Sequence, residues 1–158
     1  QAKELQALCH HYQVPFIIND DYELCDILNA DGIHLGKDDI TIEEVRDRLG
    51  NDIIVGISCY NDFERVNKMM ATNCDYIALG ACFPTKTKPN APHASLNFLE
   101  NVVEISIKPV VAIGGINLDN CVPIINSGVN AIAMINALYS TDKVSNKILE
   151  IKRKFING

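Results

Sequence analysis

The feature that most constrains the fold is a regular alternation of short apolar runs with amphipathic helical segments. Each run is rich in Val, Ile, Leu and Ala and ends in glycine or a polar cluster, which is typical of a buried strand. We expect strands at residues 14–18, 32–35, 53–57, 76–80, 109–113 and 131–135. Runs that are apolar at nearly every position, alternating with helices, predict a parallel sheet covered by helices.

Apolar residues at helical spacing predict the helices between these strands. We expect helices at 1–12, around 24–28, and at 41–49, 61–72, 96–103, 117–128 and 144–155. Thr41 and Glu44 form a capping-box pattern, and Gly50 is a suitable stop. The first helix begins at residue 1 with no Ser, Thr, Asp or Asn to cap it.

Two architectures satisfy this alternation: an open doubly wound sheet and a (β/α) barrel. The sequence has neither a Gly-x-Gly-x-x-Gly motif nor a Walker loop, and polar residues follow every strand, as in a barrel. We therefore predict an α/β fold of the TIM (β/α)₈ type, with residues 1–158 forming one domain. Such a barrel has eight strands, so we expect this chain to cover about six, with the first two strands absent from its amino terminus.

Composition and charge exclude several classes of protein. The net charge of −6 argues against a nucleic-acid surface, and no apolar run approaches the length of a membrane span. The six cysteines are scattered, without a Cys-x-x-Cys motif, which indicates free thiols in a reducing compartment. We expect a cytoplasmic protein that binds small molecules, neither nucleic acid nor membrane, and that can form a homo-oligomer.

The loop after residue 80 carries groups suited to a phosphorylated ligand. It holds the hydroxyls of Thr85 and Thr87 and the ammonium groups of Lys86 and Lys88. Donors and positive charge at the carboxyl end of a buried strand can bind phosphate. The alternative is a plain solvated loop that happens to carry lysines.

Two aspartates follow adjacent expected strands and point to a metal. Asp20 and Asp39 supply oxygen ligands without His or Cys, which suits Mg²⁺. The alternatives are that Asp20 or Asp21 caps a helix and that Asp39 sits in an ordinary turn. His34, which lies mid-strand, is interpreted as a satisfied barrel residue and not as a catalyst.

A second phosphate site is indicated near the end of the chain. Gly114 and Gly115 allow close backbone approach after one strand, and a helix beginning near Asn136 would offer free amides after the next. The alternative is that Gly114 merely ends its strand.

Taken together, several stretches resemble the thiamine-phosphate synthase family. They are Ile18–Asp21, Ala30–Gly36, Gly56–Ser58, Gly80–Lys88, Ala112–Ile116 and Ala133–Ile135. The resemblance implies a barrel enzyme that joins a pyrimidine diphosphate to a thiazole phosphate with loss of pyrophosphate. It also implies that Mg²⁺ is held by Asp20 and Asp39.

The resemblance further implies roles for individual residues. Asn19, Ser58 and Lys88 would contact the pyrimidine diphosphate and serve the chemical step, with Lys88 stabilising the departing pyrophosphate. The thiazole phosphate would be held by Thr85, Thr87, Gly115, Ile135 and Asn136. The family's Gln-x-Arg-x-Lys strand has no counterpart here, so we expect this chain alone to lack synthase activity. Asn136 stands where the family usually has Ser.

Two other functions remain open from the residues. A thiazole tautomerase of the same superfamily would catalyse only a proton shift on one phosphate, and it would have no pyrophosphate to place. A non-catalytic remnant would bind thiazole phosphate or a partner protein without turnover. The two aspartates together with the Thr-x-Thr-Lys segment favour the synthase.

Overall fold

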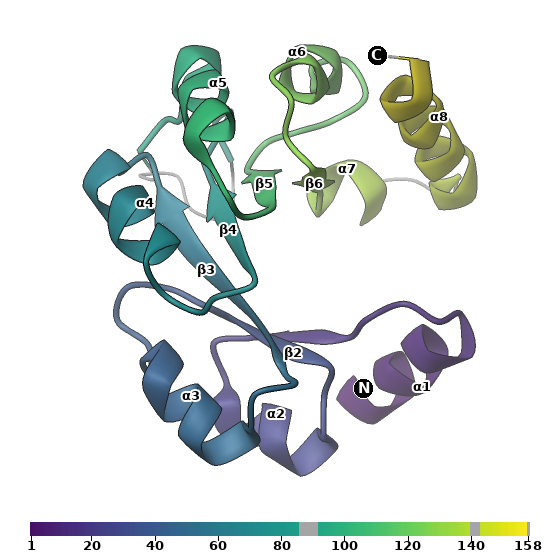
Figure 1. Cartoon of the computed structure of the whole chain (residues 1–158). Coiled ribbons are helices and arrows are strands. Elements are labelled where there is room, and N and C mark those ends of the chain that lie inside the picture. Colours follow the sequence, from purple (N-terminus) through teal and green to yellow (C-terminus); the bar gives the residue numbers. More distant parts are fainter. Residues whose placement is uncertain (86–91, 140–142, 158) are drawn as a thin grey trace.

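The structure is a computed structural model that describes residues 1–85, 92–139 and 143–157. Its centre is a parallel sheet of six described strands (Figure 1). They are β1 (Ile17–Asn19), β2 (Gly32–Leu35), β3 (Ile54–Tyr60), β4 (Tyr76–Leu79), β5 (Val110–Ile113) and β6 (Ala131–Ala133). The helices are α1 (Ala2–His11), α2 (Tyr22–Leu28), α3 (Ile42–Leu49), α4 (Phe63–Met70), α5 (Leu96–Ile105), α6 (Cys121–Asn126), α7 (Asn136–Tyr139) and α8 (Val144–Asn157).

The strand order decides between the two architectures. The strands lie side by side in chain order, from β1 to β6, and every neighbouring pair is parallel. An open doubly wound sheet reverses its order at a switch point, and no reversal occurs here. The sheet instead curves with α2 to α6 outside it, as a half-barrel (Figure 1). The predicted α/β fold of the barrel type is confirmed at this level, and the two further strands stay a prediction.

The two faces of the sheet differ in chemistry. Side chains that face the helices are fully buried, such as Ile33, Val55 and Ile77 at 0% exposure. Alternate positions face the inside of the curve and include His34 and Ser58, which are half-buried. The prediction of a parallel sheet from these mostly apolar runs is confirmed, and His34 and Ser58 are polar exceptions on the inner face. The period-two alternation of a strand places them on the face opposite the buried outer layer.

Strand β1 starts later than predicted. Gln13 after α1 has a positive φ of 56°, and Pro15 has no N–H to offer a neighbouring strand. The N–H of Phe16 donates to Oδ2 of Asp31 at 2.7 Å instead of to a strand. Ladder pairing with β2 therefore begins at Ile17.

Other boundaries also differ from the predicted ones, among them those of β3, β6 and α6. Strand β3 continues past Ser58 to Tyr60, which pairs with β4 beyond a register irregularity. Strand β6 stops at Ala133, since the carbonyl of Ile135 accepts the N–H groups that begin α7. Helix α6 begins at Cys121, because the side chain of Asn117 accepts the N–H groups of the preceding turn.

Side-chain caps start four of the helices, and they confirm the sequence signal where it was strongest. Thr41 and Glu44 form the reciprocal capping box at the start of α3. Asp21, Asp62 and Ser95 accept an N–H in the first turns of α2, α4 and α5. The first helix has no side-chain cap at Gln1. Each such cap contributes about 1 kcal/mol.

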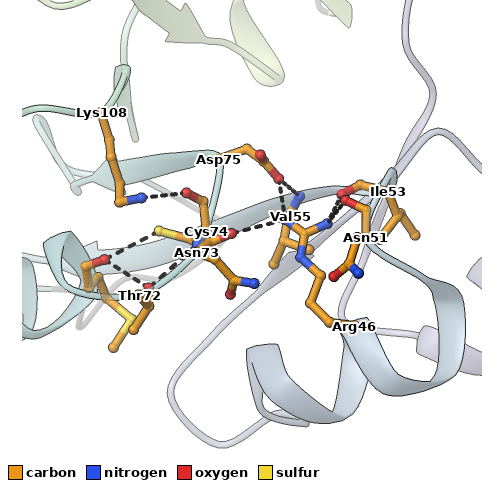
Figure 2. A network of polar contacts seen from close by, with 10 residues as sticks. Arg46, Asn51, Ile53, Val55, Thr72, Asn73, Cys74, Asp75 and Lys108 are labelled. Atoms are coloured by element: carbon orange, nitrogen blue, oxygen red, sulfur yellow. Dashed lines mark hydrogen bonds and ion pairs between the residues drawn. The ribbon is translucent and has the colours of Figure 1, made fainter.

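The amino-terminal edge of the sheet is held by one arginine (Figure 2). The side chain of Arg46, on α3, is only 8% exposed and reaches the segments that precede β3 and β4. It donates to the carbonyls of Asn51 and Asn73, each at 2.9 Å, to that of Ile53, and to Asp75 Oδ2 at 2.8 Å. A planar fork with five donors suits this convergence of oxygens.

None of the helices formed by described residues is long and apolar enough to cross a membrane. All six cysteines carry free thiols, and five of them are buried.

Candidate active site

The predicted polar residues gather at the carboxyl edge of the sheet. Asn19 is the last residue of β1, and Ser58 lies within β3. Asp20, Asp39, Thr85, Gly115 and Ile135 follow their strands in the loops, and Asn136 begins α7. Because all strands are parallel, their carboxyl ends share one edge. Thr87 and Lys88 belong to residues 86–91, which lie outside the described part of the chain.

The neighbouring aspartates after β1 have separate tasks. Asp21 Oδ1 accepts the N–H of Leu24 at 2.9 Å and caps α2. Asp20 has a positive φ of 64°, and its N–H donates to the carbonyl of His34 at 2.9 Å. Asn19 Nδ2 donates to Asp20 Oδ2 at 2.6 Å. The helix cap is therefore Asp21, and Asp20 stays at the rim.

The loop that carries Asp39 is tied to β3. Asp39 Oδ2 accepts the N–H of Gly36 at 2.6 Å, so the predicted turn role is present. Arg65 donates from Nη2 to the carbonyl of Gly36 at 3.1 Å and from Nε to that of Ser58 at 2.7 Å. A Cβ at Gly36 would lie 3.1 Å from both Asp39 Oδ2 and the Tyr60 hydroxyl. Glycine therefore allows the close fit that keeps Asp39 beside β3.

The donor chemistry at this rim fits magnesium. Asp20 and Asp39 supply hard carboxylate oxygens from adjacent strand ends. No group of three or more His, Cys, Asp or Glu residues that could hold a metal occurs among the described residues. Mg²⁺ commonly binds one or two carboxylates and keeps water and substrate phosphate in its shell. The pair therefore suits Mg²⁺ better than a metal that needs a closed protein cage.

The loops after β4 and β5 pack unusually closely. The N–H groups of Cys82 and Phe83 donate to the carbonyls of Ile113 and Gly114, each at 3.0 Å. A Cβ at Gly115 would lie 2.6 Å from the Pro84 carbonyl oxygen, and the residue has a positive φ of 64°. Glycine is required there for both reasons. This contact brings the loop that carries Thr85 against Gly115. Both residues were predicted to bind the thiazole phosphate.

The loop after β6 lies at the same edge. Ile135 is 53% exposed, and its carbonyl accepts the N–H groups of Leu138 and Tyr139. The exposed Asn136 begins α7, as predicted. Their contact with a phosphate stays a prediction.

A hydrogen-bonded chain inside the sheet was missed by the sequence reasoning. His34 Nε2 lies 2.9 Å from Ser58 Oγ, and His34 Nδ1 lies 3.0 Å from the Tyr76 hydroxyl. Burial raises the pKa of Tyr76, so its hydroxyl is neutral at neutral pH. His34 is satisfied, as predicted, but one of its partners is a predicted site residue. The signal for this link was Gly56 inside an otherwise bulky strand, which marks a close approach.

The buried thiols near the site are unsuited to nucleophilic catalysis. Burial raises the pKa of Cys59 to about 12 and that of Cys82 to about 11. Both groups are therefore protonated at neutral pH, and the thiolate is the reactive form. Neither thiol is therefore a candidate nucleophile.

A shallow depression lies at the opposite edge of the sheet. It has a volume of about 270 Å³ and is lined by His10, Gln13, Val14, Pro15 and Asp31. None of the predicted site residues contributes to it, so it is separate from the candidate active site.

Comparisons with known proteins identify the family. The family model described as thiamine monophosphate synthase matches residues 1–138. A thiamine-phosphate synthase of Methylobacillus flagellatus is 43% identical over 155 residues, which are 98% of this chain and 74% of that protein. The thiamine-phosphate synthase of Thiobacillus denitrificans is 41% identical over 155 residues, with the same two shares of 98% and 74%.

A solved structure shows the same arrangement of elements. The thiamine phosphate pyrophosphorylase of Pyrococcus furiosus superposes with a TM-score of 0.89 at 31% identity, over 99% of this chain and 74% of that one. The chain thus spans about three quarters of these relatives. With a family model matched over most of its length and relatives above 40% identity, the chain belongs to the thiamine monophosphate synthase family.

Proposed function

We propose that this chain is a thiamine-phosphate synthase. It couples 4-amino-5-hydroxymethyl-2-methylpyrimidine diphosphate with a thiazole phosphate to give thiamine phosphate and pyrophosphate. The observation that carries the proposal is the joint presence, at one sheet edge, of a carboxylate pair and a glycine-lined loop contact in a member of this family. The first suits a metal-bound diphosphate and the second a phosphate monoester.

The proposed diphosphate side is built by β1 to β3. Asp20 and Asp39 would hold Mg²⁺, and Asn19 and Ser58 would hydrogen-bond the pyrimidine diphosphate. When bound, Mg²⁺ would supply positive charge to the diphosphate oxygens. Arg65 supports this side by tying the carbonyl of Ser58 to the loop of Asp39.

The proposed thiazole side is built by β4 to β6. Thr85 and Thr87 would donate hydroxyl hydrogen bonds to the thiazole phosphate. Gly115 would let the backbone approach it, and Ile135 and Asn136 would close the site from β6. The tight packing of the Phe83–Pro84 segment on Gly115 supports a rigid platform for this phosphate. We also propose that these strands form part of a closed eight-stranded barrel, in keeping with their order without reversal.

The chemical step breaks one bond and forms another. The C–O bond between the pyrimidine methylene and the diphosphate breaks, and its electron pair leaves with pyrophosphate. The thiazole nitrogen lone pair forms the new C–N bond at that methylene carbon. Donors aimed at the departing oxygens stabilise the charge that develops there. Lys88, with Ser58 and Asn19, is proposed to supply those donors.

Titration calorimetry on the purified protein tests this function. We expect the thiazole phosphate to bind with or without Mg²⁺ and the pyrimidine diphosphate to bind only with Mg²⁺. In whichever form of the protein is active, chromatography should then detect thiamine phosphate and pyrophosphate in equal amounts when both substrates are present. Binding of the thiazole phosphate alone, without Mg²⁺ dependence or product, would indicate a tautomerase or a non-catalytic protein instead.

A further inference from the structure

Three side chains form a continuous hydrogen-bonded chain across the inner face of the sheet. Tyr76 on β4 contacts His34 on β2 through its hydroxyl, which lies 3.0 Å from Nδ1. His34 in turn reaches Ser58 on β3, where Nε2 lies 2.9 Å from Oγ. The rings of Tyr76 and His34 are also stacked, with centroids 5.5 Å apart and planes inclined at 22°.

The chain depends on a gap in the strand between its two rings. His34, Gly56 and Tyr76 occupy one register row across β2, β3 and β4. A Cβ at Gly56 would lie 2.0 Å from Tyr76 Cζ and 2.3 Å from its hydroxyl oxygen. Only glycine leaves room for the tyrosine ring to cross β3 and reach the histidine. Side chains two residues apart share a face, so Ser58 lies on the same inner face as Gly56.

The donors and acceptors available to the Tyr76 hydroxyl favour one tautomer of His34. Neutral imidazole donates from one nitrogen and accepts at the other. If Nδ1 carried the proton, the Tyr76 hydroxyl would accept it, and its own proton would need another acceptor. In the described part of the chain, His34 is the hydrogen-bond partner that the structure gives to this part-buried hydroxyl. A donor that is partly withdrawn from water is costly to leave unpaired. This count favours the tautomer in which the tyrosine donates to Nδ1 and the proton of His34 lies on Nε2.

We propose that Tyr76 and His34 are positioning residues that make Ser58 a hydrogen-bond donor to substrate. Tyr76 donates to Nδ1, Nε2–H donates to Ser58 Oγ, and the Ser58 hydroxyl proton points to the ligand. The partner of Ser58 is then an acceptor, such as a diphosphate oxygen or an unprotonated ring nitrogen of the pyrimidine. This inference rests on the proposed function for the identity of that substrate and deepens it at this one contact.

The first experiment reads the tautomer directly and needs no activity. Long-range ¹H–¹⁵N NMR of the ¹⁵N-histidine protein distinguishes a protonated from an unprotonated ring nitrogen. We expect the His34 signals, assigned by their loss in His34→Gln, to show a proton on Nε2 alone. A proton on Nδ1, with or without one on Nε2, overturns the inference. This outcome is independent of whether the protein is a synthase.

The second experiment removes only the hydroxyl of Tyr76. Tyr76→Phe keeps the stacked ring, so a packing role alone predicts no change. If the hydroxyl positions Ser58, kcat/KM of the active form of the protein for the pyrimidine diphosphate falls about tenfold, the value of one neutral hydrogen bond. KM for the thiazole phosphate stays unchanged. The matched control is Tyr22→Phe on α2, whose hydroxyl accepts from Arg48 on the outer surface.

A double variant tests whether the tyrosine acts through the serine. In the Ser58→Ala background, Tyr76→Phe has no further effect on kcat/KM if the two residues form one pathway. Independent, additive losses overturn the inference.

Two variants of His34 distinguish the effect of its hydrogen-bond donor from the effect of its size. A Gln amide can occupy the place of Nε2 and donate to Ser58, whereas an Asn amide is too short to reach it. His34→Gln is expected to retain kcat/KM within about threefold, and His34→Asn to lose about tenfold or more. Equal losses in the two variants contradict the proposal.

Discussion

At the scale of single residues, the backbone conformation separates two neighbouring aspartates, of which one caps α2 and the other does not. Asp21 has an extended backbone, and its carboxylate folds forward onto the first turn of α2. Asp20 has a left-handed backbone, with a φ of 64°, and its side chain is directed away from that helix cap. Asn and Asp adopt this conformation more readily than most residues. Adjacent residues of identical chemistry thus have separable tasks.

This separation predicts opposite phenotypes for the two aspartates. Asp20→Asn keeps the shape and the left-handed conformation but removes a proposed metal ligand. It should lower kcat roughly 100-fold at saturating Mg²⁺ and leave the melting temperature unchanged. Asp21→Ala should keep kcat and lower the unfolding free energy by about 1 kcal/mol, the value of an N-cap. The metal assignment would be refuted if Asp20→Asn kept a near-normal rate, or if Asp20→Asn lost stability while Asp21→Ala lost activity.

A third aspartate links stability to pH. The N–H of Phe16 is the main cause that lowers the pKa of Asp31, and His10 adds to the effect. A carboxyl with a lower pKa in the folded state stabilises the protein above its unfolded pKa of about 3.8. That contribution is lost as the pH falls through the lower, folded pKa.

Asp31→Asn should therefore flatten the acid limb of the stability curve. The Asn amide oxygen can still accept from Phe16, but it cannot take up a proton. Urea unfolding between pH 5 and pH 2.5 should show a smaller loss of stability in this variant than in the wild-type protein. The exposed Asp47→Asn on α3 is the control and should follow the wild-type curve. An unchanged slope in Asp31→Asn would exclude this linkage.

At the scale of elements, α3 holds the starts of β3 and β4 through one guanidinium group. Arg46 satisfies three carbonyls, and it shares Asp75 Oδ2 with the N–H of Val55, which lies 2.6 Å away. Lys108 supports the same edge by donating to the carbonyl of Cys74 at 2.7 Å (Figure 2). The register of these strands also sets the row of His34, Gly56 and Tyr76. The contacts of Arg46 before β3 and β4 thus help to fix the strand register on which the contact between Tyr76 and His34 depends.

Arg46→Lys is expected to destabilise the fold although it keeps the charge. A single ammonium cannot reach all the oxygens that the planar fork satisfies. We expect a loss of about 2 kcal/mol in the free energy of urea unfolding. Arg48→Lys, two residues along the same helix, should change it by less than about 0.5 kcal/mol, because its contacts with Tyr22 are exposed. Equal losses of stability in the two variants would contradict the prediction that the multiple hydrogen bonds of the Arg46 guanidinium stabilise the fold.

At the scale of the whole molecule, the sheet has two open edges. Within the described residues, β1 pairs only with β2, and β6 pairs only with β5. Open parallel strands present N–H and C=O groups that can pair with another chain. Exposed apolar side chains, among them Leu5 and Leu8 on α1 and Tyr139 on α7, add to this tendency.

The 158-residue chain expressed alone is therefore expected to associate. Sedimentation velocity at increasing protein concentration should show species heavier than the 17.5 kDa monomer. Addition of both substrates with Mg²⁺ should not abolish this association, because the substrates are proposed to bind at the carboxyl ends of the strands and not along the unpaired sides of β1 and β6. A monodisperse monomer at every concentration would contradict the prediction.

The local chemistry of the sequence was sufficient for the class of fold and for the position of several candidate residues at one edge of the sheet. Apolar runs of strand length between amphipathic helices predict a parallel sheet, because only that arrangement buries every such run. The Thr41–Glu44 capping box was predictable because its donors and acceptors lie within four residues. Polar residues at strand ends marked Asn19, Asp20, Asp39 and Thr85 for one edge, since parallel strands share their carboxyl side.

Only the tertiary structure decided how residues far apart in sequence meet. The register of three strands places Tyr76 across Gly56 onto His34, and nothing local to those residues specifies that row. The same is true of Arg46, whose partners precede two different strands. Whether Asp20 or Asp21 caps α2 depended on a hydrogen bond from Asp20 to β2. Periodicity and capping are local properties, whereas register, loop contact and shared hydrogen bonds depend on how the packed elements slide against one another.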